Sequence, residues 1–123
     1  MKSPKVKWLA EPEPHDYKAA ESYLSLLFVG NSPKQLRDVI SQLQRANVVS
    51  FKAKDILRAS GLPLLSIENH YVAKDRKRIR AGKKLSPLLL WRQPERLYIA
   101  DGYHRICAVY SVDEDVDIPC KIV

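Results

Sequence analysis

Apolar residues in the first half of the chain recur every three or four positions, which is the spacing of one helix face. The first such stripe consists of Ala20, Tyr23, Leu24 and Leu27, and the second of Leu36, Val39, Ile40 and Leu43. Asp16 and Ser32 are suitable N-cap residues for the two helices, and Gly30 separates them. The pattern predicts a helical hairpin over residues 17–46, preceded by an extended arm over residues 1–16.

The second half of the chain alternates short apolar runs with helical patterns, an order typical of a small α+β domain. The expected strands cover residues 48–51, 85–91, 97–100 and 116–123, and the expected helices cover residues 54–60, 69–81 and 103–111. Pro119 is expected near a strand's edge, because proline has no N–H to donate to a neighbouring strand. We therefore predict a small mixed sheet with flanking helices over residues 47–123.

Length and composition predict one domain. A chain of 123 residues, of which 46% are hydrophobic, has enough apolar material for a single core without disulfide or metal staples. The two cysteines, Cys107 and Cys120, lack the spacing of metal ligands and are expected to be reduced core residues. No apolar run approaches the roughly 20 residues that a membrane helix needs, and the first residues lack the apolar stretch of a signal peptide. We therefore expect a cytoplasmic protein without membrane contact.

Positive charge is concentrated in residues 74–84. The whole chain carries a net charge of +7, and this segment contributes +6 of it through seven basic residues and Asp75. The basic residues are Lys74, Arg76, Lys77, Arg78, Arg80, Lys83 and Lys84. Such a cluster is typical of a surface that meets phosphate, in nucleic acid or in a phosphorylated ligand, and it also occurs on solvated helix faces. No aromatic residues are interleaved with it to stack bases, and no helix-turn-helix pattern is evident.

The junction between a predicted strand and the last predicted helix contains the residues most suited to binding and catalysis. Backbone N–H groups in the first turn of a helix have no internal partners and lie at the positive end of its dipole, so they bind phosphate or carboxylate. Gly102 allows the backbone to bend there and to approach a ligand closely. Arg105 supplies a planar fork for two phosphate oxygens, and His104 can donate a hydrogen bond or pass a proton. Asp101 can accept a proton or hold a cation.

Each of these residues also has a purely structural interpretation. Asp101 is a good helix cap, Gly102 suits any tight turn, and Arg105 can pair with the acidic segment at residues 113–115. Glu68 precedes the basic helix and is either a second acid or metal ligand, or an exposed residue at a helix start. The sequence leaves these alternatives open.

Two groups in the N-terminal half have two interpretations as well. The polar group Glu11, Glu13, His15 and Asp16 either lines a site or lies on an acidic arm that contacts nothing. The apolar group Tyr23, Leu24 and Leu27 either contacts a protein partner or belongs to the core of the domain.

The order of elements in residues 66–123 and the Asp-Gly-Tyr-His-Arg motif at residues 101–105 resemble the ParB/sulfiredoxin superfamily. The most specific part is residues 100–108, which follow the Gly-to-Pro element at residues 82–87. The resemblance implies a ParB/sulfiredoxin-like α+β core in which the turn at residues 101–105 binds phosphate groups. The whole chain also resembles a family of short bacterial proteins of unassigned function.

The branches of this superfamily differ in the residues of that turn. Sulfiredoxins have Gly-Cys-His-Arg, and sulfiredoxin activity is not expected here because the phenol of Tyr103 cannot replace the thiolate. ParB proteins have Gly-Glu-Arg-Arg and a following DNA-binding helical domain, and the presence of Tyr103 and His104 argues against chromosome partitioning. The closest branch has Asp-Gly-His-His-Arg. It includes a nucleotide-dependent kinase of free serine, in which the aspartate similar in place to Asp101 acts on the substrate hydroxyl.

The sequence therefore predicts a phosphate- or nucleotide-binding protein, as a small-molecule phosphotransferase or a nucleotide hydrolase. The candidate catalytic residues are Asp101 and His104, and the candidate phosphate-binding residues are Gly102, Tyr103, His104 and Arg105. The cofactor is left open, with Mg²⁺ expected alongside the nucleotide if the protein is a phosphotransferase. The alternative is a non-catalytic nucleic-acid-binding module that uses residues 74–84. A ParB-like nuclease is a third interpretation, although the C-terminal half has no carboxylates at metal-ligand spacing.

Overall fold

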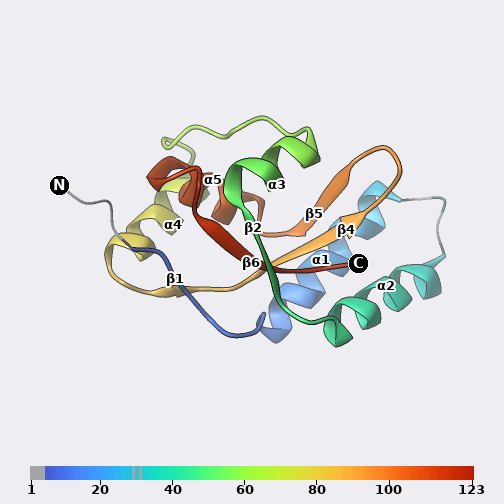
Figure 1. Cartoon of the computed structure of the whole chain (residues 1–123). Helices are drawn as coiled ribbons and strands as arrows, with labels where there is room; N and C mark the ends of the chain where they lie inside the picture. Colours follow the sequence, from blue (N-terminus) through green and yellow to red (C-terminus); the bar gives the residue numbers. More distant parts are fainter. Residues whose placement is uncertain (1–4, 29, 31) are drawn as a thin grey trace.

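A four-stranded sheet lies between two layers of helices (Figure 1). The computed structural model describes residues 5–28, 30 and 32–123. In chain order the described elements are β1 (Lys7–Trp8), α1 (Pro14–Leu27), α2 (Pro33–Arg45), β2 (Val49–Lys52), α3 (Ala53–Ser60), α4 (His70–Arg80), β3 (Lys84–Leu85), β4 (Leu88–Arg92), β5 (Leu97–Asp101), α5 (Tyr103–Val112) and β6 (Asp117–Ile122). Helices α1 and α2 cover one face of the sheet, and α3 and α5 cover the other, with α4 packed against α5.

The strand order in the sheet is β2-β6-β4-β5. Strand β2 is antiparallel to β6, β6 is parallel to β4, and β4 is antiparallel to β5. Strands β1 and β3 form a separate parallel pair in which Lys7 lies opposite Lys84. These elements confirm the predicted fold class, a mixed α+β fold with a helical hairpin ahead of the sheet. Strand β6 comes last in the chain and yet lies inside the sheet.

Strand β4 is buried on both faces. The side chains of Leu88 and Leu90 pack among α3, α4 and α5, and Leu89 packs against α1 and α2. All three leucines are fully buried. Because successive residues of a strand point to opposite faces, their burial shows that both faces of β4 are covered. The continuous apolar run in the sequence therefore belongs to a strand that is covered on both sides.

Helix α1 begins three residues earlier than the sequence pattern predicts. Its N-cap is Glu13 and its first helical residue is Pro14. Asp16 is the third helical residue, and its Oδ2 accepts a hydrogen bond from the backbone N–H of Glu13 at 2.8 Å. The prediction of Asp16 as the N-cap is therefore wrong, because its carboxylate reaches back to the cap as in a capping box. The predicted arm is also shorter, since residues 7–8 form β1 and the helix starts at residue 14.

Two prolines differ from their predicted roles. Pro87 divides the strand predicted at residues 85–91 into β3 and β4, which belong to different sheets, because a residue without an N–H interrupts a strand ladder. Pro119 lies in the interior strand β6 and not at a sheet edge. It is tolerated there because the ladder between β4 and β6 begins opposite Cys120, so that Pro119 is paired only with Ser50 of β2. The remaining predicted elements agree with the structure to within one residue at each end.

The apolar stripe of α1 is divided between core and surface. Ala20 and Leu24 are fully buried against the sheet, whereas Tyr23 and Leu27 are 40% and 43% exposed. Of the apolar stripe, Ala20 and Leu24 therefore belong to the core, and Tyr23 and Leu27 lie partly on the surface. Cys107 and Cys120 are buried free cysteines, as predicted. Among the described residues, none of the helices combines the length and the apolar character needed to cross a bilayer.

Candidate functional site

The junction between β5 and α5 is built around Gly102. Asp101 ends the strand, and Gly102 takes a φ of 112° at the N-cap of the helix. A Cβ atom at this position would lie 2.6 Å from Cγ of Leu88 and 3.0 Å from Nη2 of Arg105. Both the backbone conformation and the space therefore require glycine here.

The N-terminus of α5 is open to a ligand. No side chain of the described residues caps it, since the cap residue is glycine. The hydrogen bonding of the helix itself begins with the N–H of Ile106, which donates to the Gly102 carbonyl at 3.0 Å. The N–H groups of residues 103–105 therefore have no acceptor inside the helix. They are the donors that a bound anion would use.

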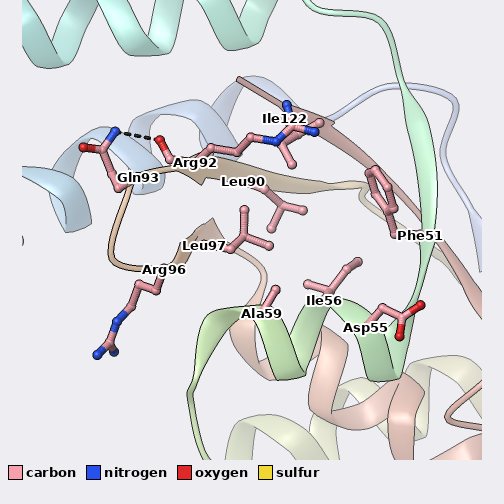
Figure 2. A pocket seen from close by; sticks show the side chains of 10 residues that line it. All are labelled: Phe51, Asp55, Ile56, Ala59, Leu90, Arg92, Gln93, Arg96, Leu97 and Ile122. Atoms are coloured by element: carbon pink, nitrogen blue, oxygen red, sulfur yellow. Dashed lines mark hydrogen bonds between the residues drawn. The ribbon is translucent and has the colours of Figure 1, made fainter.

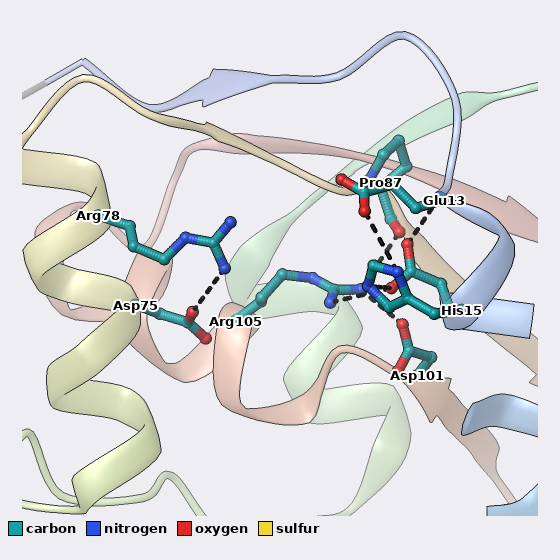
Figure 3. Close-up of polar contacts among 8 residues, drawn as sticks. Glu13, His15, Asp75, Arg78, Pro87, Asp101 and Arg105 are labelled. Carbon is teal, nitrogen blue, oxygen red and sulfur yellow. Dashed lines mark hydrogen bonds and ion pairs between the residues drawn. The ribbon is translucent and has the colours of Figure 1, made fainter. Parts of the chain in front are cut away.

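Arg105 lies at the centre of an ion cluster that joins α5, β5 and α1 (Figure 3). Its Nη2 donates to Oδ2 of Asp101 at 2.8 Å, and its Nη1 lies 3.8 Å from Oδ1 of Asp16. The Arg105 side chain is only 14% exposed, and Nη2 also donates to the Pro87 carbonyl at 3.4 Å. The guanidinium is therefore fixed between two carboxylates, and they balance its charge.

This ion cluster excludes two of the structural interpretations that the sequence leaves open, one for Asp101 and one for Arg105. Asp101 pairs with Arg105, so the interpretation of Asp101 as a helix cap is wrong. The acidic segment at residues 113–115 follows the far end of α5, where Asp115 pairs with Lys54 at 2.7 Å. The pairing of Arg105 with that segment is therefore wrong as well, because the whole length of α5 separates them.

The acidic N-terminal group is fixed to the rest of the protein. Asp16 belongs to the ion cluster of Arg105 and is 3% exposed, and Nε2 of His15 lies 3.4 Å from its Oδ1. Glu11 instead pairs with the buried Lys121 at 3.1 Å. The interpretation of this group as a free acidic arm is therefore wrong. The sequence signal for Asp16 is its position at the third residue of a helix that begins with proline.

A cavity of about 200 Å³ adjoins the junction. Its lining comes from α4 and from the start of α5: Tyr71, Lys74, Asp75, Arg78, Asp101, Gly102, Tyr103, His104 and Arg105. Lys74 and Arg78 are one helical turn apart and therefore share the face of α4 that borders the cavity. The sequence motif omits Tyr71 and Asp75, although their spacing from Lys74 and Arg78 on one helix face is a signal that could have found them.

Only two of the basic residues of 74–84 line the cavity. Lys74 and Arg78 line the cavity, whereas Lys77 and Arg80 are exposed and do not line it. Arg76 is half-buried and donates through Nη1 to Oγ of Ser111 at 2.5 Å, which ties α4 to α5. Because each helical residue turns by about 100°, a run of adjacent charges is distributed around the helix. The predicted basic patch therefore stays a prediction for the exposed residues, and Arg76 is tied to α5.

Burial is the largest influence on the pKa values of the two carboxylates that line the cavity, Asp75 and Asp101. It raises the pKa of Asp101 above that of an exposed aspartate, although Arg105 lowers this pKa, and the charge of Asp16 adds to the increase. Burial likewise raises the pKa of Asp75, against the lowering effects of Arg105 and Arg78. A raised pKa makes a carboxylate a better proton acceptor near neutral pH. Asp101 therefore combines this property with a position on the cavity.

Two other candidate residues, Tyr103 and Glu68, are placed differently from the sequence hypothesis, whereas Cys107 is buried as predicted. Tyr103 lines the cavity, but its hydroxyl donates to the Pro63 carbonyl and is therefore already paired. Glu68 is exposed ahead of α4 and does not line the cavity, so it does not act there as a second acid. Cys107 is fully buried, and this burial raises the pKa of its thiol, which makes it no substitute for a reactive thiolate.

The rings of two lining residues are in contact, tilted by 45° to each other. The ring centroids of His104 and Tyr71 lie 5.0 Å apart, so the histidine is held against α4 while it faces the cavity. The described residues contain no group of three or more His, Cys, Asp or Glu side chains that would bind a metal ion on their own.

Comparisons of this chain with models of protein families, with curated proteins and with solved structures found no match. The resemblance of residues 66–123 to the ParB/sulfiredoxin superfamily therefore stays a prediction. The candidate site rests on the geometry of the junction, the ion cluster and the cavity.

The first testable prediction concerns Gly102. Gly102→Ala is expected to lower the free energy of unfolding by about 2–5 kcal/mol, from about 1–2 kcal/mol of backbone strain and about 1–3 kcal/mol of overpacking against Leu88. Gly61→Ala is the matched control, because Gly61 has a φ of 67° and no described atom within 4 Å of the added Cβ. Chemical denaturation of both variants measures the difference, and equal losses would contradict the steric argument.

The second prediction concerns the pH dependence of Asp101. Because its pKa is raised in the folded state, its contribution to stability is present below about pH 4 and is lost as the pH rises through the folded value. The free energy of unfolding of the wild type minus that of Asp101→Asn should therefore fall between pH 4 and pH 7. Asp38→Asn, at an exposed position of α2, controls for the loss of one negative charge. A difference that rises with pH would mean that the ion pair with Arg105 outweighs burial.

Proposed function

We propose that the cavity at the start of α5 binds a phosphate group of a nucleotide or of a phosphorylated small molecule. The observation that carries the proposal is the meeting of an uncapped helix N-terminus with Lys74 and Arg78 in one cavity. A phosphate accepts hydrogen bonds from several donors at once, and backbone N–H groups, an ammonium and a guanidinium are its usual partners. The resemblance to the Asp-Gly-x-His-Arg branch of the ParB/sulfiredoxin superfamily supports the same ligand.

The charge for phosphate binding comes from α4 in this proposal. Arg105 is already balanced by Asp101 and Asp16. On α4, Arg78 is 3.9 Å from Asp75, and Lys74 forms no ion pair within 4 Å among the described residues. Lys74 and Arg78 therefore neutralise the ligand, and Arg105 holds Asp101 in place.

A phosphotransferase or nucleotide hydrolase activity extends this proposal. Phosphoryl transfer requires mainly the positioning of the reacting groups and the neutralisation of charge. Asp101 would accept the proton of the attacking hydroxyl or water, and His104 would donate a hydrogen bond to a phosphate oxygen. Mg²⁺ usually binds through one or two carboxylates together with phosphate oxygens, and Asp75 and Asp101 are the carboxylates on this cavity. The residues present are therefore compatible with a Mg²⁺–nucleotide complex.

The third prediction tests the phosphate site by ligand-induced stabilisation. Thermal unfolding is measured with ATP, ADP and pyrophosphate, each with and without Mg²⁺. A ligand at 100 times its dissociation constant adds about 2.7 kcal/mol, which is a shift of several degrees for a domain of this size. Lys74→Ala with Arg78→Ala should abolish the shift, whereas Lys77→Ala with Arg80→Ala, on the same helix but outside the cavity lining, should preserve it.

Measuring consumption of the same compounds distinguishes binding from catalysis. If one compound stabilises the protein and is consumed, Asp101→Asn should still bind it and should lose the turnover. Stabilisation that survives the double substitution at residues 74 and 78 would place the ligand elsewhere and would refute the phosphate site.

A second candidate function is nucleic-acid binding on the outer side of α4. The observation that favours it is the parallel pairing of β1 with β3, which places Lys7 opposite Lys84. The Nζ of Lys7 also lies 3.6 Å from the Cβ position of Gly82. Lys7 thus extends the exposed charges that do not line the cavity, which are Lys77, Arg80, Lys83 and Lys84. Such a surface contacts phosphates without reading base sequence.

The fourth prediction separates this surface from the cavity. If the outer side of α4 binds duplex DNA, the logarithm of the binding constant should fall with the logarithm of salt concentration, by about 0.9 for each phosphate contacted. Lys77→Glu with Arg80→Glu should abolish the binding, and Lys74→Ala with Arg78→Ala should weaken it only slightly. Fluorescence anisotropy over a salt series measures both effects. Binding that does not depend on salt would exclude this function.

A further inference from the structure

A second cavity, of about 390 Å³, lies at the opposite end of β5 from the junction (Figure 2). Its floor is apolar and is formed by Leu90 of β4, Leu97 of β5 and Ile122 of β6. Helix α3 forms a wall with Ile56 and Ala59. The volume falls within the range of about 300–1,000 Å³ that is usual for small-molecule pockets.

The cavity exists because α3 does not cover this end of the sheet. The helix has eight residues and ends at Ser60. The side chain that it directs toward the loop between β4 and β5 is that of Ala59, which is small. Phe51 of β2 closes the far side and remains 40% exposed. An apolar floor of this kind loses contact with water when an apolar ligand enters, which favours binding.

The rim of this cavity carries two unpaired positive charges. Arg92 ends β4 and extends over Ile122, and Arg96 stands in the turn that follows (Figure 2). Neither guanidinium has a carboxylate within 4 Å among the described residues. The one acidic side chain on the rim, Asp55, is 3.3 Å from Arg58 and is therefore partly neutralised.

We propose that this cavity binds a small amphipathic carboxylate, with its hydrocarbon part on the apolar floor and its carboxylate on Arg92. A guanidinium matches a carboxylate with two parallel hydrogen bonds, which an ammonium cannot do in the same geometry. Arg96 also lines the cavity, but its side chain extends away from Arg92 (Figure 2). The cavity shares no lining residue with the phosphate site, so the two sites are separate.

The fifth prediction tests this site with octanoate on the full chain. Titration followed by backbone amide NMR should give saturable shifts at the residues of α3 and at the turn between β4 and β5. Octylammonium has the same hydrocarbon chain and the opposite charge, and it should bind at least about tenfold more weakly, which corresponds to about 1.4 kcal/mol. Equal affinity for the two compounds, or shifts confined to other parts of the chain, would overturn the proposal.

Two variants and one control complete the test. Arg92→Gln, at an exposed position, should weaken octanoate binding by at least about tenfold. Arg37→Gln on α2 removes an exposed arginine on the other side of the sheet and should leave the affinity unchanged. Ala59→Leu fills the cavity and should prevent binding while the protein stays folded. Octanoate affinity that is unaffected by both Arg92→Gln and Ala59→Leu would refute the site.

Discussion

The burial of strand β4 on both of its faces is the constraint on which the other features depend. Leu88 and Leu90 pack on one side and Leu89 on the other, so neither face of β4 is available to a polar group. Polar chemistry is therefore restricted to the ends of the strands, where the backbone leaves the core. One end of β5 passes through Gly102 into α5, and the other begins at the rim of the larger cavity. The same sheet thus separates a charged cavity from an apolar one.

The arginine of the Asp-Gly-Tyr-His-Arg motif serves the fold as well as the site. Because Arg105 contacts carboxylates from β5 and α1, it connects the helical hairpin to the strand end. A buried guanidinium between two carboxylates gains little net stability from its charges, yet removing one partner leaves an uncompensated charge in the interior. The three groups are therefore expected to be retained together. In the cavity at the start of α5, the cations that do not belong to this cluster come from α4, outside the motif.

The sequence predicts local structure well and long-range pairing poorly. Helical stripes, capping residues and apolar runs identified nearly every element and the motif at residues 101–105, because these signals depend on neighbours within one or two turns. The division of the strand at Pro87 and the interior position of β6 depend on residues far away in the chain. The same is true of the site. Asp16 reaches Arg105 only because α1 packs on the sheet, and the separate roles of the charges on α4 follow from its packing against α5.

The interior position of β6 sets the order in which the chain can fold. Val49 pairs with Cys120, and Leu88 pairs with the same residue from the other side, so the sheet has no continuous set of hydrogen bonds until the final strand is present. During synthesis, β2 and the hairpin of β4 and β5 emerge from the ribosome before the strand that joins them. Native contacts between residues so far apart close late and slow the folding reaction. Until then, the chain exposes unpaired strand edges, which can associate with other chains.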